Sequence, residues 1–271
     1  MRELLLIVGV VLAGAGLRSF AHPWLRRAGA LMYLGATWLA AWLATGNYFL
    51  AAGAVSLWFF LPWLQILTHV RHLRLPLDKP LRSTFPPSAD RFPQLGEMTS
   101  EITAAGFTQV DDTSSEWEST RQFMRLFYHE AGKTQAAICL LEQDEAALAW
   151  VSLSSRLPDG RTWTTWNYPF SHTMKLPPET RLHTILEADS FEDLQAAHRD
   201  FLARESVQID DLAAVDPEEF SDVLQRETRR QVDHNLDEGL ITLSGEGTFR
   251  YSFRGYLFLW RQFLRDMVRL S

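Results

Sequence analysis

Three long apolar segments dominate the first 70 residues of this chain, at positions 4–20, 29–45 and 48–68. The second and third segments contain no Asp, Glu, Lys, Arg or His. Because a hydrocarbon core of roughly 30 Å is crossed by about 20 apolar residues in a helix, these segments predict membrane-spanning helices. Core helices of a soluble protein rarely contain two adjacent uncharged runs of this length.

The first segment is the shortest of the three, with 14 residues at positions 4–17 before Arg18. It crosses a membrane only if the Arg18 side chain reaches toward the interface and residues 19–21 contribute. A cleaved signal peptide is the alternative, with an apolar stretch at 4–12 and a small-residue cleavage site at 13–15. We expect an uncleaved three-helix anchor, since three spans place the basic residues that flank the segments, described next, on one side of the membrane.

Basic residues lie in two clusters beside these segments: Arg18, Arg26 and Arg27 after the first, and Arg71, Arg74, Lys79 and Arg82 after the third. Three spans place both clusters on the same side of a membrane. The positive-inside rule makes that side cytoplasmic. We therefore expect a multi-pass protein of a bacterial cytoplasmic (inner) membrane, with its N-terminus outside and its C-terminal part in the cytoplasm.

The charge balance changes along the chain. Residues 1–79 carry 7 Lys and Arg against 2 Asp and Glu, whereas the remainder carries 19 against 31. Nucleic-acid binding depends on basic side chains that neutralise phosphates, so nucleic acid is not an expected partner of this acidic remainder. The single cysteine, Cys139, excludes an intramolecular disulfide and fits a reducing compartment. Its apolar neighbours indicate a small buried side chain rather than a nucleophile.

Small residues recur every four positions in the second segment, at Ala36, Ala40 and Ala44. Such a ridge lets a neighbouring helix approach closely. The neighbour is either the first segment, where Gly9 and Ala13 have the same spacing, or a second copy of the chain. The expected partners are therefore the lipid bilayer, a homo-oligomer formed through this ridge, and a protein partner on the face of the sheet predicted below.

Residues 71–94 form a basic collar followed by a proline-rich linker. Arg71, Arg74 and Lys79 are expected to contact anionic headgroups at the membrane surface. The prolines favour an extended chain that holds the following domain away from the membrane.

Residues 95–271 predict a cytoplasmic α+β domain. A short helix at 94–105 precedes four strand-like runs, at 122–129, 134–142, 146–157 and 161–168. The connections between these runs are too short for crossover helices, so they predict a four-stranded antiparallel meander. Two helices then begin at Ser190 and Asp216, which are residue types that cap helix N-termini.

The last helix, at residues 255–270, is amphipathic, and Arg261, Arg265 and Arg269 form a basic ridge beside its apolar face. Such a helix can lie in a membrane interface, where its arginines contact headgroups. It can equally pack its apolar face on the domain. We expect packing on the domain, since burial is the usual fate of amphipathic helices.

Three polar residues around the last strand of the meander are the candidate ligand-binding set: Arg161, Asn167 and His172. Together they would bind an anionic ligand beside an exposed tryptophan. The structural alternative is that the Asp-Gly pair before Arg161 only forms a hairpin turn and the neighbouring threonines only favour a strand. The sequence shows no nucleophile–base pair, phosphate loop or metal motif, so it predicts no catalytic residue, metal or cofactor.

Residues 240–255, LITLSGEGTFRYSFRG, follow a long predicted helix and resemble the wing of winged-helix regulators. The resemblance implies a strand–turn–strand that leads into a helix, and the nearby Arg226, Arg229 and Arg230 are residues that a nucleic-acid-binding tail would use. The order of spans, proline linker and meander with a D-G-R…T-x-x-N strand also resembles uncharacterised bacterial membrane-anchored proteins. That second resemblance implies an architecture and no activity.

These patterns lead us to expect a membrane-anchored cytoplasmic binding, sensing or scaffold module rather than an enzyme. A membrane-tethered enzyme with dispersed residues and a signalling protein with a winged-helix-like tail are the alternatives. A pocket where His, Asp or Glu side chains converge would favour the enzyme. A flat sheet with an exposed apolar patch would favour the binding module.

Overall fold

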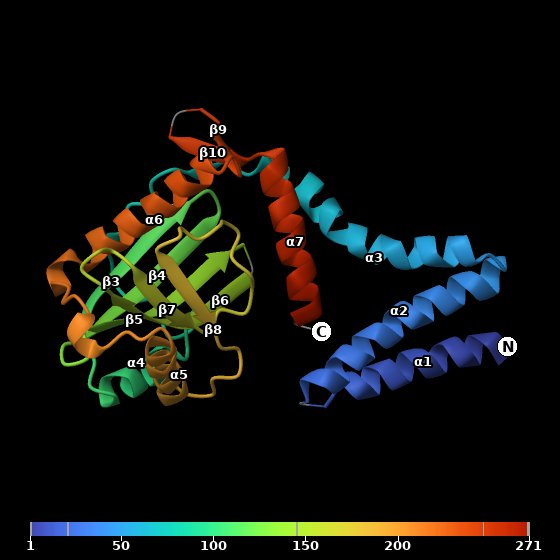
Figure 1. The fold of residues 1–271 in the computed structure, drawn as a ribbon, viewed down its shortest axis with the longest axis horizontal. Helices are drawn as coiled ribbons and strands as arrows, with labels where there is room; N and C mark the ends of the chain where they lie inside the picture. Colours follow the sequence, from blue (N-terminus) through green and yellow to red (C-terminus); the bar gives the residue numbers. More distant parts are fainter. Residues whose placement is uncertain (1, 21, 145, 246, 270–271) are drawn as a thin grey trace. The chain divides into compact units, whose positions relative to one another are not determined.

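The computed structural model describes residues 2–20, 22–144, 146–245 and 247–269 (Figure 1). Its fold class is α+β, as the sequence predicts. Two compact units make up the chain. The helical unit consists of Met1–Leu73, Ser171–Thr173 and Arg250–Ser271, and the sheet unit consists of Arg74–Phe170 and Met174–Phe249.

The helical unit begins with α1 (Arg2–Arg18), α2 (Pro23–Thr45) and α3 (Tyr48–Thr68). Among the described residues, two helical stretches are long and apolar enough to cross a membrane, Trp24–Thr45 and Tyr48–His72. Only 11% and 17% of the residues in an 18-residue part of the first and second stretch are buried, whereas core helices of soluble proteins are mostly buried. The predicted three-helix anchor is therefore matched only in part, because α1 ends at Arg18 after 17 residues.

A tight turn joins α2 to α3. Gly46 adopts a left-handed φ of 64°, which glycine tolerates without strain, and its N–H donates to the Trp42 carbonyl. Asn47 then caps α3, because its Oδ1 accepts a hydrogen bond from the Phe49 N–H at 2.8 Å. These local contacts end one helix and start the next.

Glycines set the closest approach between α1 and α2. A Cβ placed on Gly29 would lie 2.6 Å from the carbonyl oxygen of Gly14, so no larger side chain fits there without a shift. The contact thus uses a small-residue pair outside the predicted alanine ridge. Within that ridge Ala36 is 5% exposed, Ala40 is half-buried and Ala44 is exposed.

The last helix, α7 (Phe253–Arg269), packs against α3 within the helical unit. The indole N–H of Trp260 donates to the carbonyl of Phe59 at 2.8 Å, three residues before Pro62. Proline lacks an N–H and opens the preceding helical turn, so carbonyls there accept hydrogen bonds from other segments. Part of the apolar face of α7 therefore packs on α3, one of the predicted membrane-spanning helices. The sequence does not reveal this contact.

Within the described residues, seven strands form the large sheet, in the order β2-β3-β4-β5-β6-β7-β8. All neighbouring strands are antiparallel except β7 and β8, which are parallel. The strands are β2 (Arg82–Ser83), β3 (Thr108–Trp117), β4 (Thr120–His129), β5 (Thr134–Gln143), β6 (Ala146–Arg156), β7 (Thr162–Trp166) and β8 (Thr180–Thr184). The predicted four-stranded meander corresponds to β4–β7 and is matched only in part, because the sheet contains three more strands.

The sequence does not reveal β3, because residues 108–117 are mostly polar and show no apolar alternation. The strand is nevertheless partly buried. The Asp112 carboxylate accepts hydrogen bonds of 2.8 and 2.7 Å from the Arg125 guanidinium of β4. This charge-assisted cross-strand pair allows a polar strand to lie in a covered sheet.

Helices cover both faces of the large sheet (Figure 1). One face packs against α4 (Leu95–Ala104) and α5 (Phe191–Arg204), and the other packs against α6 (Phe220–Asp237). The first core includes Phe123, Phe127, Ile138 and Leu153, and the second includes Met124, Leu126, Tyr128, Cys139 and Trp150. Because both faces are covered, β4 carries apolar side chains on both sides, and Arg125 among them is paired with Asp112.

Residues 74–94 pack into the sheet unit, in contrast to the free spacer that their prolines predict. β1 (Leu75–Pro76) pairs with β10 (Thr248–Tyr251), which also neighbours β9 (Ile241–Leu243). β2 adds an edge strand to the large sheet. The prolines are tolerated because the pairings are short and lie at sheet edges. Short 3-10 helices complete the described elements: η1 (Val70–His72), η2 (Ile209–Asp211) and η3 (Pro217–Glu219).

Candidate functional site

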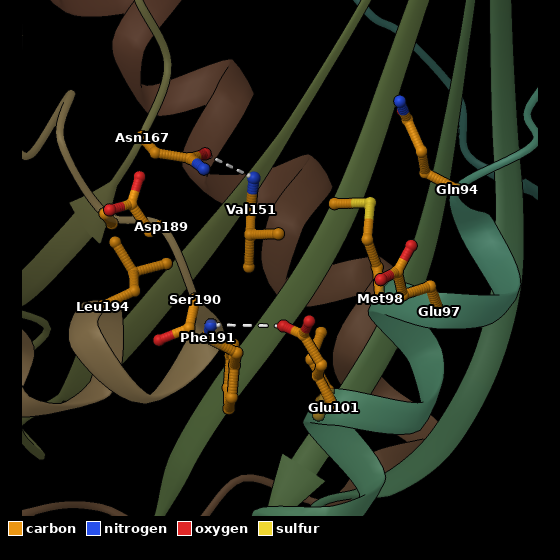
Figure 2. Close-up of a pocket in the computed structure, with 12 residues that line it drawn as sticks. Gln94, Glu97, Met98, Glu101, Val151, Asn167, Asp189, Ser190, Phe191 and Leu194 are labelled. Atoms are coloured by element: carbon orange, nitrogen blue, oxygen red, sulfur yellow. Dashed lines mark hydrogen bonds between the residues drawn. The ribbon is translucent and has the colours of Figure 1, made fainter.

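A cavity of about 270 Å³ opens between α4, α5 and the large sheet (Figure 2). Its lining side chains include Glu97, Met98 and Glu101 from α4, Asp189, Ser190, Phe191 and Leu194 at the start of α5, and Val151 and Asn167 from the sheet. The lining segments lie far apart in the sequence, so the cavity exists only in the folded chain.

The two helices place their polar groups at the cavity for local reasons. Glu97 and Glu101 lie four residues apart and so share one face of α4. Ser190 caps α5, because its Oγ accepts a hydrogen bond from the Asp193 N–H at 3.2 Å. Glu101 Oε2 also accepts a hydrogen bond from the Phe191 N–H at 3.3 Å, which joins α4 to the N-terminal end of α5 (Figure 2).

Asn167 forms the sheet side of the cavity. It follows β7, and its Oδ1 accepts a hydrogen bond from the Val151 N–H at 2.7 Å (Figure 2). The side chain thus extends the pairing between β6 and β7 by one position. This hydrogen bond holds the amide group in place at the cavity wall.

The cavity has a single sign of charge. The carboxylates of Glu97, Glu101 and Asp189 line it, and none of its described lining residues is basic. All three belong to exposed residues, so the cavity opens to solvent. Such a lining favours a cationic group over the anionic ligand that the sequence suggests.

The fold separates the predicted ligand-binding residues within the sheet unit. Arg161 precedes β7 and forms an ion pair of 2.8 Å with Asp159 beside a different cavity, of about 470 Å³. Asn167 follows β7 and lies at the opposite end of that strand. Of these two residues, Asn167 lines the acidic cavity and Arg161 does not.

His172, the third predicted residue, belongs to the helical unit. Its ring centroid lies 6.3 Å from that of Phe258 in α7. Burial lowers the pKa of His172, and the nearby Arg265 lowers it further. The adjacent Ser171 donates from its Oγ to the Asp266 carboxylate of α7 at 2.6 Å, so this short segment tethers α7.

The predicted membrane-surface residues lie in different environments. Arg71, Arg261 and Arg265 are exposed, and Arg269 lies 3.7 Å from the Asp266 carboxylate. Arg74 and Lys79 make contacts within the sheet unit: the Arg74 N–H donates to Glu118 at 3.3 Å, and the Lys79 ammonium lies 3.8 Å from the Trp117 ring centroid. Burial lowers the pKa of Lys79 to about 8.

His198 on α5 forms a buried polar cluster and is only 2% exposed. Its Nε2 lies 3.0 Å from the Ser155 Oγ, and its Nδ1 lies 2.9 Å from the Thr165 Oγ1. Burial lowers the pKa of His198 to about 4, and His183 adds to the shift, so the ring is neutral at pH 7. Ser155 is fully buried, so no substrate reaches this serine–histidine pair.

Cys139 is buried, and Arg229 is held in ion pairs. Burial raises the pKa of the Cys139 thiol to about 12, so the side chain remains protonated at neutral pH. Across the described part of the chain, no cluster of three or more His, Cys, Asp or Glu side chains could hold a metal ion. The Arg229 guanidinium on α6 is paired with Asp78 and Asp233, at 2.9 and 3.0 Å.

The three carboxylates of the cavity could not be predicted from the sequence, because they belong to no known motif. The signal for Glu97 and Glu101 is their four-residue spacing opposite the apolar face of a predicted helix. Asp189 is marked only by the capping serine that follows it. None of these features indicates that α4 and α5 meet.

We compared the chain with protein-family models, with curated proteins and with solved structures, and none of them matches it.

Proposed function

We propose that this protein is a membrane-anchored cytoplasmic binding module whose cavity between α4 and α5 receives a small cationic group, such as a primary amine or a guanidinium. The observation that carries the proposal is the convergence of Glu97, Glu101 and Asp189 on one cavity that has no basic side chain among its described lining residues. Carboxylates bind such cations through charge-assisted hydrogen bonds.

Exposed apolar surface supports the anchor. Large side chains along the two span-length helices are open in the isolated chain, including Leu31 at 66%, Phe49 at 88% and Leu64 at 63% exposed. Water does not tolerate a continuous apolar surface of this extent, whereas lipid covers it without cost. α1 completes a three-span anchor in this proposal if the helix tilts little and Arg18 reaches the interface.

The flanking charges support the orientation. Arg26 and Arg27 lie near the start of α2, and Arg71 follows α3. Both positions are on one side of a helical hairpin, and the positive-inside rule makes that side cytoplasmic. The protein is then a multi-pass protein of a bacterial inner membrane with its sheet unit in the cytoplasm.

A membrane-tethered enzyme is the competing function, since converging carboxylates also occur in hydrolases. A general acid needs an apolar environment that keeps its proton at neutral pH. Glu97, Glu101 and Asp189 are all exposed to solvent. Binding of a cation therefore accounts for this cavity better than acid–base catalysis does.

The location is tested with the full chain in bacterial cells. A C-terminal reporter that is active only in the cytoplasm should give signal, and the protein should stay in the membrane pellet after alkaline carbonate extraction. A reporter signal from the periplasm would reverse the orientation. Release by carbonate would overturn the anchor.

The ligand is tested by calorimetric titration of the detergent-solubilised full chain with agmatine, which carries both an amine and a guanidinium. Replacing Glu97 by Gln and Asp189 by Asn together should weaken binding by roughly tenfold, since each removes a charge-assisted hydrogen bond. Glu187→Gln removes a nearby exposed carboxylate outside the cavity and should leave the affinity unchanged. Binding of citrate in place of agmatine, or equal affinity in all variants, would refute the site.

A further inference from the structure

We propose that the helical unit binds an anionic phospholipid, with an acyl chain in a cavity between α2, α3 and α7 and with the phosphate beside Arg18 and Arg27. The inference rests on the proposed membrane location and adds to it a specific lipid site. It concerns a cavity separate from the acidic one of the sheet unit.

The cavity has the size and the walls that a hydrocarbon chain requires. Its volume is about 670 Å³, within the usual range of ligand sites. Its apolar walls include Leu31, Leu34, Phe59, Leu264, Met267 and Val268. Burying a polar ligand against such walls would leave its polar groups without hydrogen bonds, so the main part of the ligand must be apolar.

The cationic groups of the cavity gather at the connection between α1 and α2. Arg18 is the last residue of α1, and Arg27 lies near the start of α2. The Arg18 guanidinium carbon lies 5.8 Å from the Tyr33 ring centroid, and that of Arg27 lies 5.5 Å from the Trp24 ring centroid. In the part of the chain that the structure describes, neither guanidinium forms an ion pair with a carboxylate. Both are therefore available to an anion.

The order of residues along α2 matches the order of groups in a phospholipid. Arg27, Leu31 and Leu34 lie four and three residues apart and so share one face of the helix. At 1.5 Å per residue, Leu31 and Leu34 lie roughly 6 and 10 Å deeper along the helix than Arg27. Tryptophan and arginine at a span end mark the headgroup level, so the lipid phosphate and Arg27 are expected at the same depth.

The tail helix completes the site. Leu264, Met267 and Val268 come from the last two turns of α7 and close the cavity opposite α2. α7 is held there by the hydrogen bond from Trp260 to the Phe59 carbonyl. A lipid in the cavity would contact the spans and the tail helix at the same time.

A neutral lipid and a soluble anion each match only half of the cavity. A net-neutral lipid such as phosphatidylcholine also carries a phosphate, but its choline cation is repelled by the two guanidinium groups, which suit the bidentate geometry of an anionic phosphate. A free phosphate gains nothing from the apolar walls. An anionic phospholipid uses both, which is why we assign it as the occupant.

The test is native mass spectrometry of the full chain released from nanodiscs that contain equal amounts of phosphatidylglycerol and phosphatidylcholine. The wild type should retain phosphatidylglycerol preferentially. The double variant Arg18→Gln, Arg27→Gln should retain roughly tenfold less, since each basic residue contributes measurably to binding of an anionic lipid. Arg26→Gln is the matched control, because Arg26 lies in the same connection but does not line the cavity.

A second pair of variants tests the apolar half. Met267→Trp fills the cavity and should reduce retention of phosphatidylglycerol by several-fold. Leu257→Trp adds the same bulk at an exposed position of α7 that does not line the cavity, and it should have no effect. Thermal unfolding of each variant in detergent shows whether the fold is intact.

Equal retention of the two lipids by the wild type would overturn the proposal, as would equal losses in the double variant and in Arg26→Gln. Glycerol phosphate that competes as well as phosphatidylglycerol would identify a soluble-anion site instead. Carbonate extraction separates this failure from failure of the anchor: a protein that stays in the pellet without lipid selectivity refutes only the lipid site.

Discussion

The contacts inside the helical unit differ in kind from the contacts inside the sheet unit. In the sheet unit, two apolar cores lie on opposite faces of one sheet, and the ion pairs Asp112–Arg125 and Arg156–Glu227 are partly buried beside them. In the helical unit, a glycine pair and a tryptophan hydrogen bond to a backbone carbonyl make the close contacts. Water drives apolar burial, whereas lipid, the surroundings that we propose for the helical unit, gives helices no such reason to associate.

The same residue types therefore have opposite uses in the two units. Leucine and phenylalanine are buried at the sheet and exposed along α2 and α3, and glycine and tryptophan provide interhelical contacts instead. Variants at these contacts should affect one unit and spare the other.

The largest effect is expected for Phe127→Ala. Phe127 is fully buried in the core between β4 and the helices α4 and α5, so the substitution leaves a cavity and should lower the free energy of unfolding by about 4 kcal/mol. Urea denaturation of the full chain in detergent, with hydrogen exchange read on β4 and β5, measures it. Phe85→Ala, at a residue that is 91% exposed, should change the stability little. Faster exchange in α1–α3 would show that the units are not independent.

A change of pH should act on the sheet unit next most strongly. His198 titrates near 6.5 in an unfolded chain and near 4 in the fold, so the unfolded state binds the proton more readily between these values. Stability is therefore complete above about pH 6.5 and falls as the pH drops toward 4, by about 3 kcal/mol in all. Urea midpoints across this range measure the slope.

His198→Gln should be less stable at neutral pH but should show a flatter pH profile over the same range. His183→Gln is the control and should keep most of the slope, since His183 contributes less to the shift than burial does. An unchanged slope in the His198 variant would assign the pH dependence to other groups.

Gly29→Ala tests the close contact of the helical unit. The added Cβ would meet the Gly14 carbonyl oxygen at 2.6 Å, so α1 and α2 must separate, at a cost of about 2 kcal/mol. Thermal unfolding in detergent and hydrogen exchange of α1 measure the effect. Gly35→Ala on the same helix meets no atom within 4 Å and should be harmless. Equal effects of the two substitutions would mean that α1 does not pack on α2 at this point.

The smallest effect is expected for Trp260→Phe, which removes the N–H donated to the Phe59 carbonyl and should cost about 1 kcal/mol. Faster hydrogen exchange in α7 is the expected result. With Pro62→Ala in the background, the helical turn can close again and the effect of Trp260→Phe should shrink. A cost that is the same in both backgrounds would exclude any link between this hydrogen bond and the proline.

Parts of the fold could be predicted because their signals are local. The runs that become β4–β7 are rich in strand-forming residues and are separated by short turns, and Ser190 and Asp216 occupy N-cap positions. The sequence did not predict β3 or β8. β3 is polar, and it is held in the sheet by the ion pair between its Asp112 and Arg125 of β4. The candidate site was also not predicted as a whole. The sequence indicated Asn167 but not the carboxylates that line the same cavity, and no sequence pattern indicates that Glu101 lies beside Phe191.

Local sequence is sufficient to place the apolar segments, the turn between α2 and α3, the meander and the helix starts, since each depends on residues within a few positions of one another. Residues 74–94 join the sheet unit, α7 packs on α3 and three carboxylates meet at one cavity only in the folded chain. The physical reason is the same in each case. These contacts join segments between 30 and 201 residues apart in the chain, as in Ser83–Thr113 and Trp260–Phe59, and no local pattern records them.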